Sequence, residues 1–197
     1  MREEKELNKS QERKQNQIRK RAFRNQEKKS QTVVDIETTG LSSYGAEIIE
    51  VSALRYRGDK FSAAFSSLIK PSAPIPYFIT QLTGITNQMV ADARERKEVL
   101  RDFAEFLAGD VIIGHNVNFD VNFLYDELSA HLGYTMSNDF VDVLKLSRKY
   151  LPDLSDHKQV TVASYFSLDV SGAHRALKDT ELCAENYLRI KEIALHS

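Results

Sequence analysis

A shortage of cysteine and of long apolar runs limits the class of protein to which this sequence can belong. Cys183 is the only cysteine among 197 residues, so no internal disulfide can form, which fits a reducing compartment. No apolar run approaches the roughly 20 residues that a membrane-spanning helix needs. The basic residues near the N-terminus precede no apolar stretch, so we expect no signal peptide. These absences predict a soluble cytoplasmic protein with no membrane partner.

Charge is divided unevenly along the chain, although the formal net charge is only −1. Residues 1–30 contain 11 Lys+Arg and 5 Asp+Glu, a net of +6, which leaves a net of −7 for residues 31–197. Large apolar residues are scarce in the first segment, so burial there cannot offset the entropy cost of ordering. We interpret 1–30 as a basic polar arm, disordered or a solvated helix, and 31–197 as one domain. The charge of the arm would suit a polyanionic partner, and the charge of the domain would suit bound cations. Alternatively, the arm is a passive, solvated tail.

Apolar periodicity beyond residue 31 predicts an α/β fold. The clustered Pro71, Pro74 and Pro76 interrupt regular structure, and residues 77–91 resemble short helices or turns. Three consecutive strands, followed by helices interleaved with two more strands, indicate a mixed sheet covered by helices. The strands are expected at 32–36, 47–57, 61–69, 110–114 and 140–143. The longer helices are expected at 95–107, 117–132, 144–150, 160–166 and 176–195.

Two carboxylates stand at the end of the first expected strand. Asp35 and Glu37 are two residues apart, so they point to the same face, and the preceding Val33 and Val34 indicate that this strand is buried. Two like charges on a buried face repel each other and lose hydration. A bound cation would remove both penalties, whereas on a solvent-facing edge such a pair would need no explanation.

Three further residues give weaker signals when each is taken alone. Asp120 lies near the start of a helix, where a carboxylate often serves only the helix dipole. Asp179 is expected within the last helix, five residues after His174 in a loop. A histidine exchanges protons near neutral pH and can act as a general base, although an ordinary surface histidine is the simpler reading. Four carboxylates together suit two hard divalent cations, Mg²⁺ or Mn²⁺, which can clamp a phosphodiester.

Three ordered segments resemble the exonuclease motifs of the DnaQ-like, or DEDDh, 3′→5′ exonucleases. They are DIETTGL at 35–41, HNVNFD at 115–120 and HRALKD at 174–179. LTGIT at 82–86 resembles a further recurring segment of the family, and the match extends from about residue 32 to 190. The residues of these segments most resemble those of the proofreading exonuclease domain of Gram-positive-type replicative polymerases.

The resemblance implies a ribonuclease H-like fold, with a five-stranded mixed sheet flanked by helices, and hydrolysis from a 3′ end that releases nucleoside 5′-monophosphates. By the same resemblance, Asp35 would bridge two metal ions, Glu37 and Asp179 would complete the nucleophile-side site, and Asp120 would hold the leaving-group ion. His174 would be the general base.

The resemblance also assigns residues around the metal site. Thr38, Leu41 and Phe119 match positions that contact the terminal nucleotide, and stacking of a base on an aromatic ring suits sequence-independent binding of single strands. Core packing is the alternative for Leu41 and Phe119. Asp142 matches a recurring aspartate with a supporting role, and we expect His115 to be a hydrogen-bonded structural residue.

These residues predict a 3′→5′ exonuclease acting on single-stranded DNA or frayed 3′ ends, in proofreading or repair. An exoribonuclease that trims RNA is the alternative within the same class, distinguished by contacts to the 2′-hydroxyl. A non-catalytic nucleic-acid or polymerase accessory module is the alternative from another class. Because 197 residues are too few for a polymerase, we expect the chain either to act alone or to join a DNA polymerase in trans.

Overall fold

The computed structural model describes residues 30–43 and 45–196. Residues 1–29 of the expected basic arm therefore lie outside the described part, and the arm remains a prediction. Within the described residues, no helix combines the length and the apolar character needed to cross a membrane.

A five-stranded mixed sheet forms the centre of the molecule, as predicted. Strands β1 (Gln31–Thr38), β2 (Ile48–Arg57) and β3 (Lys60–Leu68) pair antiparallel, while β4 (Val111–Gly114) and β5 (Phe140–Asp142) extend the sheet in parallel from β1. The spatial order is β3-β2-β1-β4-β5, so β1 lies in the middle. Its central position buries most of β1 and brings its end between elements from distant parts of the chain.

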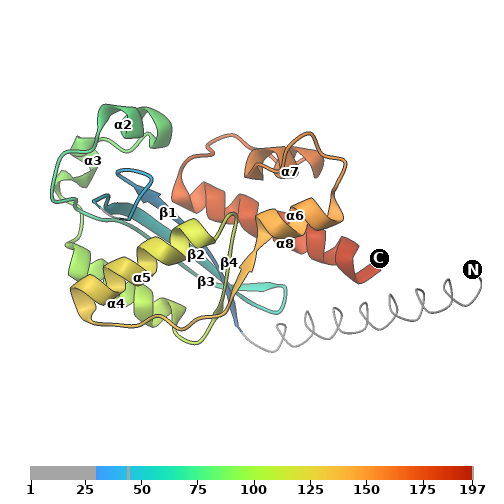
Figure 1. Cartoon of the computed structure of the whole chain (residues 1–197), viewed down its shortest axis with the longest axis horizontal. Coiled ribbons are helices and arrows are strands. Elements are labelled where there is room, and N and C mark those ends of the chain that lie inside the picture. The colour runs from blue at the N-terminus through green and yellow to red at the C-terminus, as the bar shows by residue number, and fades with distance from the viewer. Residues whose placement is uncertain (1–29, 44, 197) are drawn as a thin grey trace, which may run out of the picture.

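Helices cover both faces of the sheet (Figure 1). Helices α4 and α5 lie on one side, and α8 lies on the other with α6 and α7 packed beside it. The predicted short helices at 77–91 and the longer ones all form. The helices are α2 (Tyr77–Thr83), α3 (Asn87–Ala91), α4 (Arg96–Leu107), α5 (Asn118–Leu132), α6 (Val143–Tyr150), α7 (Gln159–Tyr165) and α8 (Ala176–His196).

The alternation of side chains along β1 divides the core into two layers. Val34 and Ile36 pack against α4 and α5 on one face. Val33 packs on the other face with the buried Cys183 and neighbouring residues of α8. Because successive side chains alternate, Asp35 and Glu37 continue the Val33 face towards the start of α8. The apolar core thus ends where the carboxylates begin.

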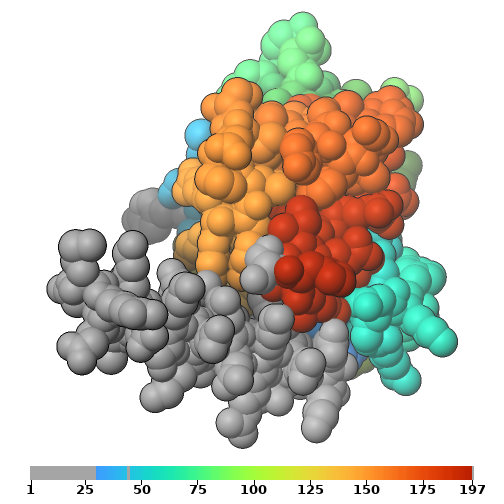
Figure 2. Space-filling view, turned by 90° about the vertical axis from the view of Figure 1, so that its right-hand side faces the viewer, coloured from blue at the N-terminus to red at the C-terminus, as the bar shows by residue number. Residues whose placement is uncertain are grey.

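The LTGIT segment builds the corner between α2 and α3. Gly84 ends α2 with a φ of 72°, a left-handed conformation that favours glycine. The Thr83 hydroxyl donates to the Ile79 carbonyl at 3.0 Å and accepts from the Ile85 N–H at 3.1 Å. Ile79 and Ile85 then pack with Ile49 of β2. This motif therefore fixes a lobe beside the sheet, and Figure 2 shows the lobe projecting at the top of the molecule.

The C-terminal part of α8 is attached to the β2–β3 turn of the sheet. The buried Lys191 ammonium lies 2.8 Å from the Asp59 carboxylate in the β2–β3 turn. Figure 2 shows this end of α8, in red, against the turn, in cyan. This pair holds the C-terminal part of α8 against the sheet.

Candidate active site

A cavity of about 350 Å³ opens at the carboxyl end of β1 and brings together residues from all three motifs. It contains the five predicted chemistry positions, four further motif residues and part of the segment that begins α7. The lining residues are Asp35, Ile36, Glu37, His115, Asn116, Phe119, Asp120, Lys158, Gln159, Val160, His174 and Asp179.

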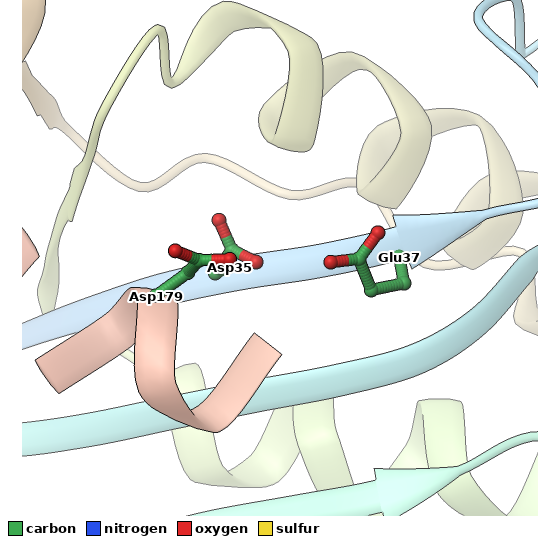
Figure 3. Close-up of side chains that lie close together, drawn as sticks. All are labelled: Asp35, Glu37 and Asp179. Atoms are coloured by element: carbon green, nitrogen blue, oxygen red, sulfur yellow. The ribbon is translucent and has the colours of Figure 1, made fainter. Parts of the chain in front are cut away.

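Three carboxylates converge in this cavity. Asp35 and Glu37 point from β1, and Asp179 points towards them from the first turn of α8 (Figure 3). One oxygen from each of the three lies within 4.8 Å of the other two. Oxygen atoms so arranged form a potential binding site for a hard divalent cation.

Asp120 reaches the same cavity from the opposite layer of the molecule. It lies in the first turn of α5 and is buried, and its Oδ1 accepts a hydrogen bond from the Ile36 N–H at 3.2 Å. This bond ties the start of α5 to the backbone of β1, between Asp35 and Glu37. Asp120 lies outside the group of three convergent oxygens but shares their cavity.

His174 belongs to the loop before α8, as predicted. Its φ of 71° is unusual for a residue other than glycine, and its side chain is exposed at the cavity. The His174 N–H donates to Asp179 Oδ2 at 2.8 Å. The loop geometry therefore links the histidine directly to the carboxylate that follows it five residues later.

Burial and mutual repulsion make the carboxylates of this cavity hard to ionise. Burial raises the pKa of Asp35 well above its ordinary value, and the charges of Asp120, Asp179 and Glu37 raise it further. Burial, followed by Asp179 and Glu50, raises the pKa of Glu37 to about 8. The pKa of Asp120 rises to about 7, mainly because the group is buried, although the hydrogen bond from the Ile36 N–H lowers it in part. Such a cluster favours either protons or a bound cation.

Two residues beside the cluster were missed by the sequence reasoning. Glu50 of β2 is opposite Glu37 in the strand register and is buried. Its carboxylate accepts from the Arg175 guanidinium at 2.8 Å and from the Ala176 N–H at 3.2 Å, so it fixes the start of α8. A charged residue inside the apolar run of β2 was the available signal for Glu50. No local pattern pointed to Arg175 as its partner.

The three expected substrate-binding residues differ in their surroundings. Phe119 lines the cavity while packing on Phe123, with ring centroids 4.9 Å apart. Leu41 is 86% exposed, which excludes core packing for it. Thr38 is buried outside the cavity lining, and its hydroxyl donates to the Gly40 carbonyl at 2.6 Å. Thr38 therefore shapes the turn that presents Leu41.

Asp142 supports the second motif. Its Oδ1 accepts from the Asn116 N–H and from the Leu144 N–H, both at 3.0 Å, and so caps α6 while holding the loop before α5. His115 is the first residue of this loop. Burial lowers the pKa of His115, and a hydrogen bond with the His157 backbone partly offsets this by raising it. Among the described residues, its Nδ1 has no hydrogen-bond partner.

Residues 32–187 match the exonuclease family model named RNase_T. The chain belongs to this exonuclease family. It is 36% identical over 160 residues to DNA polymerase III subunit epsilon of Aquifex aeolicus, a match that covers 81% of this chain and 79% of that protein. It is 42% identical over 160 residues to a PolC-type DNA polymerase III of Caldanaerobacter subterraneus subsp. tengcongensis, covering 81% of this chain and 11% of that protein. The chain thus spans about a tenth of the PolC-type relatives.

Solved structures confirm the ribonuclease H-like fold. Exonuclease X in complex with 5′ overhanging duplex DNA aligns with a TM-score of 0.66 at 24% identity, covering 82% of this chain and 91% of that one. The zinc-bound complex of E. coli ExoI with single-stranded DNA aligns with a TM-score of 0.76 at 16% identity, covering 84% and 41%. The predicted family and the class of hydrolytic nuclease are confirmed. Exonucleases of this type depend on divalent metal, which the carboxylate cluster suits.

Proposed function

We propose that this chain is a two-metal-ion 3′→5′ exonuclease that removes nucleoside 5′-monophosphates from single-stranded or frayed 3′ ends of DNA. The main support is the convergence of Asp35, Glu37 and Asp179, whose oxygens lie within 4.8 Å of one another. Asp120 and His174 line the same cavity, so all five residues proposed for the chemistry face one space.

The donor set fits divalent cations. All the ligands on offer are carboxylate oxygens, which Mg²⁺ and Mn²⁺ prefer. Burial, together with repulsion between the carboxylates, raises the pKa values of Asp35 and Glu37. Asp35, Glu37 and Asp179 would hold one ion, and Asp35 with Asp120 would hold the second. Bound ions of this kind stabilise the charge that develops on the attacking and leaving oxygens of a phosphodiester.

The remaining residues of the cavity would handle the proton and the strand. His174, exposed at the cavity, would accept the proton of the attacking water. Phe119 would stack on the terminal base, Leu41 would contact it from the exposed β1–β2 loop, and Thr38 would hold that loop in place. Lys158, a cation among the lining residues, would bind a phosphate of the strand.

DNA is the favoured substrate because the relatives at 36% and 42% identity are DNA polymerase III proteins. The same relatives support a DNA polymerase as a partner in trans and a cytoplasmic location. RNA trimming remains the alternative activity. The buried, uncompensated carboxylates argue against a non-catalytic accessory module, since such a module would gain nothing from their repulsion.

The test is digestion of single-stranded DNA and RNA of one sequence, each labelled at the 5′ end in one sample and at the 3′ end in another. With Mg²⁺ or Mn²⁺, the 5′-labelled DNA should shorten stepwise, and the 3′ label should appear at once as a mononucleotide. EDTA should stop both reactions. Internal cuts, faster digestion of RNA, or no digestion with either metal would contradict the proposal.

A further inference from the structure

The geometry points to Gln159 as a positioning residue that orients the Asp179 carboxylate towards the cation site. This inference rests on the proposed function, in which Asp179 is a metal ligand. Gln159 is the first residue of α7, and its side chain lines the same cavity as the carboxylate cluster.

The two oxygens of Asp179 are held from two different segments. Gln159 Nε2 donates to Oδ1 at 2.9 Å, and the His174 N–H donates to Oδ2 at 2.8 Å. The same amide nitrogen lies 3.1 Å from the Asp179 backbone oxygen, so Gln159 holds both the side chain and the main chain of this residue. A carboxylate oxygen can accept more than one bond, so each keeps capacity for a cation. Together the two donors prevent the carboxylate from rotating.

Gln159 is itself fixed to the helix that presents Asp179. The side-chain amide of the fully buried Asn186 donates to the Gln159 carbonyl at 3.1 Å. Asp179 and Asn186 are seven residues apart on α8, which places them on the same side of the helix. The first residue of α7 is therefore attached to α8 at two points, about two turns apart. This attachment makes the amide donor part of a rigid frame.

The chemical nature of the donor suits this role. At the neighbouring Glu50, the donor is the Arg175 guanidinium, which neutralises the carboxylate it binds. A cation at position 159 would do the same to Asp179 and would compete with a metal ion. A neutral amide orients the carboxylate and leaves its negative charge available. Hydrogen bonds to metal ligands commonly contribute about 10–100-fold to metal affinity or activity.

The experiment measures Mn²⁺ binding to the full chain by calorimetry, without nucleic acid, for wild type and Gln159→Leu. We expect Mn²⁺ affinity to fall about 10–100-fold. The Mg²⁺ concentration for half-maximal hydrolysis should rise, with much of the rate recovered at saturating Mg²⁺. Gln88→Leu makes the same change at an exposed position of α3 and should alter neither measurement.

Unchanged Mn²⁺ affinity in Gln159→Leu would overturn the inference, including the case where only the melting temperature of the metal-free variant falls. If that variant does not fold, Gln159→Met keeps the approximate side-chain length, removes the donor without adding charge and should also weaken Mn²⁺ binding; equal affinity there overturns the inference. The proposed function fails in a different way. In that case Asp179→Asn would bind Mn²⁺ as tightly as the wild type does, or the wild type would bind none.

Discussion

The two ends of β1 treat buried charge in opposite ways. At the start of the strand, the buried Asp110 carboxylate accepts from Arg55 Nε at 2.7 Å and from the Thr32 hydroxyl. At the other end, Asp35 and Glu37 are surrounded by Asp120 and Asp179, carboxylates of the same sign. Arg175 lowers the pKa of Glu37, but its guanidinium is held by Glu50. At the start of β1 the chain supplies a cation for the buried carboxylate, and we call this the balanced end. At the other end the carboxylates face one another without such a cation, and we call this the unbalanced end.

A similar balance appears elsewhere in the fold. Arg96 lies between Glu47 and Glu127, at 2.6 and 2.8 Å from their oxygens, and Lys191 pairs with Asp59. A buried charge is costly unless it is paired, so the chain supplies partners where the charge serves the fold. The carboxylate cluster lacks such partners. Among the described residues, it lies in a cavity that is lined by residues of all three motifs. An unbalanced cluster in a cavity is the electrostatic sign of a functional site.

The largest expected effect comes from Asp35, the residue proposed to contact both metal ions. Asp35→Asn should reduce hydrolysis below detection, because the substitution weakens a ligand of both proposed ions. The metal-free fold should survive or become more stable, since one of several repelling charges is removed. Turnover of labelled DNA and urea unfolding in EDTA measure the two effects. Near-normal turnover in Mg²⁺ would show that the unbalanced end of β1 is not the metal site.

The next effect concerns His174. His174→Ala should lower the rate about 10²–10⁴-fold, which is the usual contribution of a general base. Mn²⁺ affinity and DNA binding should stay close to wild type, because the loop contact to Asp179 comes from the His174 backbone. The measurement is the single-turnover rate as a function of pH. If rates match between about pH 6 and 9, His174 has only a structural role.

A change at the balanced end should affect stability and not catalysis. Arg55→Met leaves the Asp110 carboxylate buried without its cation but can keep the packing of the side chain over Phe106. We expect a loss of about 1–3 kcal/mol in the free energy of unfolding by urea. The exposed pair of Lys70 and Glu95, 3.8 Å apart, gives the matched control, and Lys70→Met should cost at most about 1 kcal/mol. A large fall in the rate per folded molecule of Arg55→Met would blur the distinction between the two ends.

The pH dependence of the metal-free chain should reflect the unbalanced end. The pKa of Glu37 is raised from 4.5 to about 8, so the folded chain binds this proton more tightly than the unfolded chain. The resulting stabilisation is complete below the ordinary pKa and is lost as pH rises towards the folded value. In EDTA, the melting temperature should therefore contain a component that falls from about pH 5 to 8. Glu37→Gln or saturating Mg²⁺ should reduce this slope; an identical slope in all three samples would contradict the assignment.

Much of this picture could be predicted from the sequence because it depends on local patterns. The alternation of Val33, Asp35 and Glu37 and the apolar runs gave the strands, although β1 extends to Thr38 because its polar end still pairs with β2. The contacts that could not be predicted join residues far apart in the chain. Glu50 and Arg175 are 125 residues apart in the chain. Gln159 contacts Asp179 only because α7 packs against α8. Such pairs depend on tertiary geometry that no local pattern records.

The smallest expected effect tests whether charge outside the described residues compensates the acidic domain. Residues 1–29 have a net charge of +6, and the deletion should stop there because the Ser30 carbonyl accepts from the Val111 N–H at 3.0 Å. We expect the variant to keep the wild-type rate on bound substrate and to capture a long DNA strand a few-fold less well at low salt. Each phosphate that the arm neutralises adds about 0.7 to the steepness of log affinity against log salt for a single strand.

The control for this deletion is an arm of the same length in which every Lys and Arg is replaced by Gln. If long-range attraction is the function of the arm, the neutral arm and the deletion should show the same shallower salt dependence. Two outcomes would separate the alternatives. Equal slopes in all three proteins would leave the arm a passive tail, whereas a loss seen only on deletion would indicate docking by its sequence and not by its charge. In either case, the positive charge of the arm would not be what attracts DNA to the unbalanced end of β1.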